Sequence, residues 1–344
     1  MPLITEYHEV KEIYRDAAER RVGLPVFCAE DRETLEAILA AALELGQEIG
    51  VADLPIIPAW TVRYPGRGQM TLLTACGDPR LGTRLMFGDL RAFMSEDSPY
   101  RRLRVLPHLD HGFPWLDGDI MEAYAGEFAS IMCDASERPF EENIRLTAQY
   151  VDGMRGRVVV EGAVDEIYEA GGAGSKNEPT SVEQARRFVS ETGVDLIVPN
   201  VGTEHRATAD QVVYRAERAQ EISAAVGPIL CLHGTSSVKP ADLARLPADG
   251  FVKINVYTTL AVHGGQAVAR EVLRSLPGIF DQAQLQELVS AGMVTQAALT
   301  GQAKPKLAVV ANPPRRDAWF GAVKRRCQDF LRAFNYAAYG KNGG

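Results

Sequence analysis

The chain has 344 residues, of which 46% are hydrophobic, so it is long enough to bury the core of one large α/β domain or of two small ones. Its formal net charge of −8 argues against a general binder of nucleic acid or of anionic membranes. No apolar run reaches the length of a transmembrane helix, and the charged stretch from Met1 to Glu19 lacks the apolar centre of a signal peptide. Five cysteines without CxxC spacing favour reduced thiols, so we expect a cytoplasmic protein.

The predicted elements alternate between helices and short apolar strands. The strands are continuous apolar runs, as expected where both faces are buried, and cover residues 22–28, 54–60, 103–110, 128–134, 157–161, 194–201, 228–232 and 251–256. Predicted helices cover residues 4–19, 31–46, 84–94, 116–125, 140–154, 180–192 and 209–225. Thr180 and Glu183 predict a capping box at the start of one of these helices. The segment 64–82 is rich in glycine and arginine and predicts a long loop that covers a site.

This alternation predicts a closed (β/α)8 barrel, or TIM barrel. The barrel and its N-terminal helix are expected over residues 1–280, and a C-terminal helical extension over residues 281–344. The aromatic side chains of the terminal helix, at 317–339, are expected to cover the barrel or to contact a neighbouring subunit. A doubly wound open sheet is the alternative, but no GxGxxG motif follows the first strand.

The segment Val105 to Gly112 is an apolar run that leads into two histidines on either side of a carboxylate. Side chains alternate between the faces of a strand, so His108 and Asp110 are expected to share one face. His111 is expected where the chain turns at the end of the strand. Parallel-sheet enzymes keep their chemistry at these carboxyl ends, so the segment predicts a site there.

Two more histidines, His205 and His233, also follow apolar, strand-like runs. If the barrel forms, they meet His111 at one mouth, and three imidazoles with an open position are typical of a catalytic zinc site. Such an ion polarises a substrate carbonyl. Asp110 is placed to move a proton to or from a substrate oxygen. His108 is either a group that supports the metal ligands or a core histidine bonded to the backbone.

Five segments together resemble the class II fructose-bisphosphate aldolases, in that family's order and at roughly its spacing. They are residues 107–112 (PHLDHG), 130–136 (SIMCDAS), 202–205 (GTEH), 232–234 (LHG) and 253–256 (KINV). The resemblance implies a zinc-dependent barrel lyase, usually dimeric, that acts on a donor of the dihydroxyacetone-phosphate type through a zinc-stabilised enediolate. It implies that His111, His205 and His233 are the zinc ligands, and that Asp110 is the acid/base for the aldehyde-derived oxygen.

The resemblance also assigns groups around the metal and the substrate. The residues that fall where the family holds its donor and phosphate, together with two pocket positions that differ from the family, are Gly202, Gly234, Ser236, Asn255, Thr258, Tyr257 and Cys28. Asp134 and Glu161 match carboxylates near the metal that tune or orient its ligands. A monovalent cation is a further cofactor that the sequence leaves open.

Several positions depart from the family's pattern. Cys28 stands where the family usually has Asn, Tyr257 replaces a carboxylate, and Glu161-Gly162-Ala163 lacks the second carboxylate of a Glu-x-Glu motif. The glycine-rich segment 171–176 lacks the acidic residues that supply the family's base for the donor carbon. The candidates to replace that base are Glu166, Glu169 and Glu178, among which the sequence does not decide.

These departures favour a divergent zinc aldolase whose substrate is a ketose or ketose phosphate other than fructose 1,6-bisphosphate. Two alternatives remain: a zinc-dependent isomerase or epimerase on the same site, and a non-catalytic barrel subunit. We expect one divalent metal per subunit, a homodimer or larger homo-oligomer, a carbohydrate-like substrate, and neither nucleic acid nor membrane as a partner. Arg63, Arg67 and Arg84 are candidates for a second phosphate site, although most arginines of this kind are solvated.

Overall fold

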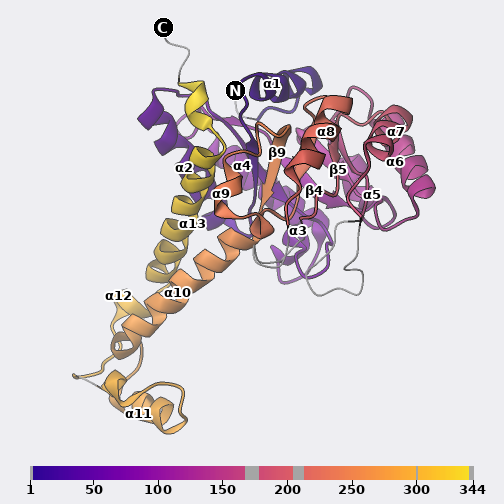
Figure 1. The fold of residues 1–344 in the computed structure, drawn as a ribbon. Helices are drawn as coiled ribbons and strands as arrows, with labels where there is room; N and C mark the ends of the chain where they lie inside the picture. Colours follow the sequence, from indigo (N-terminus) through magenta and orange to yellow (C-terminus); the bar gives the residue numbers. More distant parts are fainter. Residues whose placement is uncertain (1–2, 167–177, 204–212, 300, 341–344) are drawn as a thin grey trace.

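The computed structural model describes residues 3–166, 178–203, 213–299 and 301–340, and eight parallel strands in it close into a barrel surrounded by helices (Figure 1). The barrel strands are β1 (Leu24–Cys28), β2 (Pro55–Trp60), β4 (His108–Gly112), β5 (Ser130–Cys133), β6 (Val159–Ala163), β7 (Leu196–Val198), β8 (Leu230–Leu232) and β9 (Phe251–Val256). Strand β1 pairs in parallel with both β2 and β9, which closes the sheet. The predicted TIM barrel is therefore confirmed.

One helix precedes the first barrel strand and the others follow it along the chain, and together they surround the barrel (Figure 1). They are α1 (Tyr7–Glu19), α2 (Arg32–Ile49), α3 (Gln69–Leu72), α4 (Pro79–Phe93), α5 (Pro114–Ala123), α6 (Phe140–Met154), α7 (Val182–Thr192), α8 (Ala216–Val226) and α9 (Pro240–Leu243). The capping box of α7 pairs Ser181 with Gln184, one residue later than predicted. The hydroxyl of Thr180 has other partners, since it accepts a bond from the Asn200 amide and donates to Asp165.

The predicted third strand is interrupted. Strand β3 (Arg104–Val105) pairs with the start of β2, and β4 pairs with its end. Pro107 lies between them, and a proline supplies no N–H group to a strand ladder. The expectation of one continuous strand over 103–110 is thus corrected to two short segments.

Strand β4 also carries a local irregularity that places the site residues. His111 has a φ of +48°, and the register with β5 shifts between Leu109 and Gly112. In a regular strand, Asp110 and His111 would point to opposite faces. Here both are buried, and the His111 Nε2 atom lies 3.9 Å from Asp110 Oδ1. A left-handed residue with a side chain costs about 1–2 kcal/mol, and this cost brings two adjacent polar groups to one place.

The C-terminal part of the chain forms a helical hairpin that extends away from the barrel (Figure 1). Helices α10 (Thr258–Ile279) and α13 (Pro313–Ala333) lie side by side, and α11 (Gln282–Ser290) and α12 (Leu307–Val310) lie toward the far end. Trp319 of α13 donates from Nε1 to Thr34 Oγ1 of α2 at 2.8 Å. The Phe330 ring lies 6.5 Å from the Phe27 ring of β1, so the terminal helix contacts the barrel of its own chain.

Within the described ranges, no helix has both the length and the apolar character that crossing a membrane requires.

Candidate metal centre and active site

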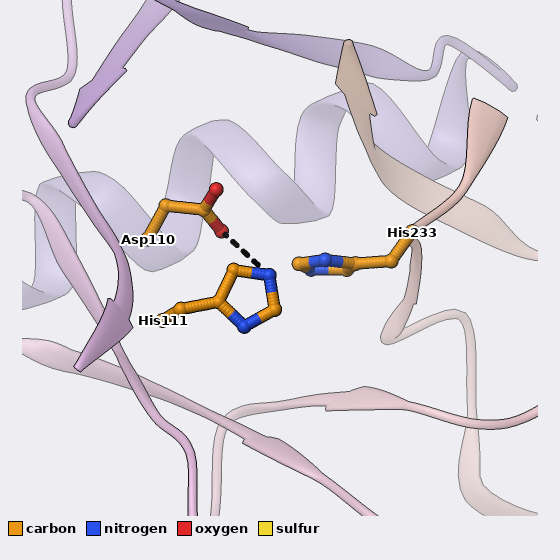
Figure 2. A group of neighbouring side chains, drawn as sticks. All are labelled: Asp110, His111 and His233. Atoms are coloured by element: carbon orange, nitrogen blue, oxygen red, sulfur yellow. Dashed lines mark ion pairs between the residues drawn. The ribbon is translucent and has the colours of Figure 1, made fainter. Parts of the chain in front are cut away.

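Three buried side chains from distant parts of the chain point toward one another at the barrel mouth (Figure 2). Asp110 and His111 come from β4, and His233 directly follows β8. One potential ligand atom from each lies within 4.8 Å of the others. The two imidazole rings lie 4.9 Å apart at an angle of 82°. The mouth is formed by the carboxyl ends of the strands, which is where enzymes with this fold place their chemistry.

A carboxylate orients each of the two imidazoles. His111 Nδ1 donates to Asp134 Oδ2 at 2.7 Å, and Asp134 also accepts a bond of 2.6 Å from the Ser136 hydroxyl. His233 Nε2 lies 3.2 Å from Glu161 Oε1. A carboxylate on one ring nitrogen fixes the tautomer and makes the other nitrogen a better metal ligand.

The residues present fit a zinc-type ion. In a metal-bound protein, the ligand atoms would be Nε2 of His111 and Nδ1 of His233. Burial lowers the pKa of His233, which favours the neutral imidazole that a metal needs. Imidazole nitrogens with oxygen donors are ligands that zinc accepts. The third predicted ligand, His205, lies outside the described residues.

A buried cation lies near the candidate metal centre. The side chain of Lys253 is fully buried, and its Nζ atom lies 2.6 Å from Glu161 Oε2 and 3.1 Å from His108 Nε2. His108 Nδ1 in turn contacts the backbone oxygen and the hydroxyl of Ser130, at 3.0 and 2.8 Å. Burial and the charge of Lys253 lower the pKa of His108 to about 3, so this imidazole is neutral. His108 is therefore a buried histidine whose two ring nitrogens contact Ser130 and Lys253, and it is not one of the three grouped ligand candidates.

The charge of Lys253 keeps Glu161 ionised. Burial opposes ionisation of Glu161, but Lys253 and the bond from His233 outweigh this effect and hold its pKa below the usual range. Glu161 thus carries a negative charge between the cation and the imidazole. The sequence analysis names Lys253 only within the segment 253–256, which resembles the aldolase family. It does not predict that this lysine is buried beside Glu161.

The carboxylate of Asp110 is held on both oxygens. Asn255 donates from Nδ2 to Oδ1 at 2.9 Å, and Arg67 donates from Nη2 to Oδ2 at 2.8 Å. Burial opposes ionisation of Asp110, but His111 and Arg67 outweigh it and hold its pKa well below the usual range. The Cys28 thiol lies 3.6 Å from the same carboxylate.

Of the three arginines named as candidates for a second phosphate site, Arg67 lies in the site. Most arginines of this kind are solvated, but Arg67 is only 7% exposed and donates to Asp110. Its neighbour Arg63 instead pairs with Asp117 and Asp119. A usable signal was present, because the loop was predicted to cover a site and carries a cation opposite the carboxylate of Asp110.

A cavity lies beside this cluster, and most of the predicted substrate-binding residues line it. Those residues are Gly234, Ser236, Asn255, Tyr257 and Thr258. Cys28 lies behind Asp110, and Gly202 is not among the described residues that line the cavity. Gly234 has a φ of +71°, a conformation that favours glycine, and it begins the turn Thr235–Ser237.

None of the three candidates for the base is among the described residues that line the cavity. Glu166 and Glu178 are both exposed and lie outside its lining. The third candidate, Glu169, lies outside the described residues.

Known proteins with similar sequences include fructose-bisphosphate aldolases. Two fructose-bisphosphate aldolases, from two strains of Staphylococcus epidermidis, are each 30% identical to this chain over 185 residues. The match covers 52% of this chain and 62% of each relative, which is less than two thirds of their length.

Solved structures of aldolases share the fold at low sequence identity. Fructose-bisphosphate aldolase from Campylobacter jejuni has a TM-score of 0.72 at 18% identity, over 97% of this chain and 96% of that chain. The YdjI aldolase from Escherichia coli K12 has a TM-score of 0.62 at 22% identity, over 94% and 96%. The family described as fructose-bisphosphate aldolase class-II matches residues 8–312. Because this match covers most of the chain, the protein belongs to the class II fructose-bisphosphate aldolase family.

Proposed function

We propose that this protein is a divergent metal-dependent aldolase that reversibly cleaves a ketose or ketose phosphate other than fructose 1,6-bisphosphate. The observation that carries the proposal is the convergence of Asp110, His111 and His233 in one buried cluster at the barrel mouth. Membership of the aldolase family supports it, as does the cavity beside the cluster. The changed residues around that cavity, Cys28 and Tyr257 among them, support a substrate that differs from the family's usual one.

His111 and His233, together with His205, are the residues that we propose hold one zinc or related divalent ion. When bound, such an ion polarises the substrate carbonyl and stabilises negative charge on oxygen. The carboxylates of Asp134 and Glu161 orient the two imidazoles for this task.

Asp110 moves the proton that accompanies cleavage. In the cleavage direction it accepts the proton of the hydroxyl group on the carbon that becomes the aldehyde. The carbon–carbon bond breaks, and its electron pair moves to the carbonyl half of the substrate. In the condensation direction Asp110 returns the proton. Its low pKa makes the carboxylate the resting form, and the bonds from Asn255 and Arg67 fix its orientation.

We also propose a homo-oligomer, since the hairpin carries apolar side chains that the single chain leaves exposed. Leu273 is 61% exposed, Met293 73% and Leu307 82%. Exposed apolar surface on one extended hairpin is suited to burial against another copy of the chain. Sedimentation of the purified protein as a monomer at micromolar concentration would contradict this part of the proposal.

A search for triose products tests the aldolase proposal. The zinc-loaded protein is incubated with a panel of ketose 1-phosphates, and dihydroxyacetone phosphate is detected by a coupled dehydrogenase assay. We expect release of the triose by the wild-type protein. Interconversion of sugars without triose would support an isomerase or epimerase instead. A protein without stoichiometric metal and without turnover would support a non-catalytic barrel.

A further inference from the structure

Arg67 is a buried cation in the wall of the cavity. Its Nη2 atom donates to Asp110 Oδ2 at 2.8 Å, and its Nη1 atom lies 3.3 Å from the Cys28 sulfur. The guanidinium carbon lies 5.1 Å from the centre of the Tyr64 ring and 4.6 Å from that of the Tyr257 ring. The two rings and the two polar contacts hold the guanidinium in one place.

The Arg67 side chain makes fewer hydrogen bonds to described residues than its guanidinium has N–H groups. Its side-chain bonds to described residues use two of the five N–H groups of a guanidinium. The side chain lines the cavity, so other N–H groups are available there to a ligand. Burying a cation costs several kcal/mol, and an apolar side chain would fill the space between two tyrosine rings at lower cost if packing were its only role.

We propose that Arg67 binds a carboxylate of the substrate, on the half that is released as the aldehyde. This inference rests on the proposed function, because Asp110 marks where the aldehyde oxygen lies. Arg67 contacts the Asp110 carboxylate directly, so the acidic group that it binds lies within a few bonds of the reacting carbon. The substrate class is an acidic ketose, cleaved to a ketone donor and a short aldehyde acid.

The shape and charge of the site favour a carboxylate. The guanidinium lies over the faces of two aromatic rings, and its planar edge matches a planar carboxylate with two parallel hydrogen bonds. Burial raises the pKa of Cys28 to about 12, so the thiol is neutral and does not compete for the charge of Arg67. The other buried cation nearby, Lys253, is paired with Glu161 and is not among the residues that line the cavity.

The first test compares matched aldehydes in the condensation direction. Dihydroxyacetone phosphate is the donor, and glyoxylate and glycolaldehyde are two-carbon acceptors with and without a carboxylate. The quantity compared is the ratio of kcat/KM for glyoxylate to kcat/KM for glycolaldehyde, because Arg67 also touches Asp110 and its loss slows both reactions. We expect the ratio to fall about 10- to 100-fold in Arg67→Gln, from the loss of a charged hydrogen bond. In Arg63→Gln, the control on the same loop, we expect no change, because Arg63 faces Asp117 and Asp119.

The second test needs no turnover. Calorimetric titration of D-glycerate into the EDTA-treated full-length protein measures carboxylate binding directly. We expect the Kd to rise about tenfold or more in Arg67→Gln and less in Arg67→Lys, which keeps the charge but loses the planar fork.

The outcomes separate the possible failures. An equal Kd in wild type and Arg67→Gln, or an unchanged acceptor ratio, would overturn the role of Arg67. If only the preference for glyceraldehyde 3-phosphate over glyceraldehyde is lost in Arg67→Gln, the ligand is a phosphate and the carboxylate assignment is wrong. Absence of an aldol product with every acceptor would overturn the proposed function, while the calorimetry would still decide the anion site.

Discussion

Removal of the charge of the buried Lys253 is expected to lower the free energy of unfolding strongly. The side chains of Lys253 and Glu161 are both fully buried, and their charged atoms lie 2.6 Å apart. Lys253→Met keeps the length of the side chain and removes its charge, which leaves the Glu161 carboxylate buried without its cation. Breaking a buried pair in this way costs about 3–5 kcal/mol. Since whole domains are stable by only about 5–15 kcal/mol, the variant loses a large share of its stability.

A surface pair provides the matched control. Lys324 Nζ lies 2.6 Å from Glu44 Oε1, the same separation, but the two side chains are 24% and 44% exposed. Exposed pairs contribute about 0–1 kcal/mol, so Lys324→Met is expected to change the free energy of unfolding by no more than that. Burial, and not the distance between the charges, then accounts for the difference between the two substitutions.

Urea denaturation measures both effects. The proteins are treated with EDTA, because a bound metal would add its own binding energy to the folded state. The double variant Lys253→Met/Glu161→Gln removes both charges and is expected to recover part of the loss. If Lys253→Met costs no more than Lys324→Met, the reasoning about the buried pair is refuted.

Four further substitutions test the site and the hairpin. Asp134→Asn is expected to weaken zinc affinity about 10- to 100-fold by releasing the His111 ring, and competition with a chromogenic chelator measures this; unchanged affinity would contradict the orienting role. Asp110→Ala is expected to retain zinc and lose about 10²- to 10⁴-fold in kcat, so full activity would exclude it as the acid/base. Gly264→Ala is expected to destabilise the protein by about 1–3 kcal/mol, because a Cβ atom there would lie 2.7 Å from the Trp319 ring. The added Cβ atom of Gly265→Ala meets nothing within 4 Å, so this variant is expected to stabilise the helix by up to about 1 kcal/mol. Thermal unfolding measures both glycine variants, and equal effects on stability would refute the packing argument.

The barrel was predictable because its strands are buried on both faces. Several strands are therefore short apolar runs that stand out from the polar segments around them, as in Leu196–Val198 and Leu230–Leu232. The convergence of His111 and His233 followed from the fold alone, since the carboxyl ends of parallel strands share one mouth.

Other features depend on tertiary context that a sequence pattern does not encode. The left-handed conformation of His111 occurs where the register with β5 shifts, and that pairing is set by the fold. The burial of Arg67 depends on Tyr64 and Tyr257, which lie far apart in the chain and meet only in the folded site. The direction of the C-terminal hairpin likewise follows from the packing of α10 against α13, where Gly264 admits the Trp319 ring.

Metal content tests the central claim most directly. The full-length protein is loaded with zinc, dialysed and analysed by mass spectrometry beside the His233→Ala variant. We predict one ion per chain in the wild-type protein and less than about a tenth of that in the variant, because the variant lacks one of the converging imidazoles. A wild-type protein that retains no stoichiometric divalent ion, or a variant that retains as much as the wild type, would contradict the proposed metal centre.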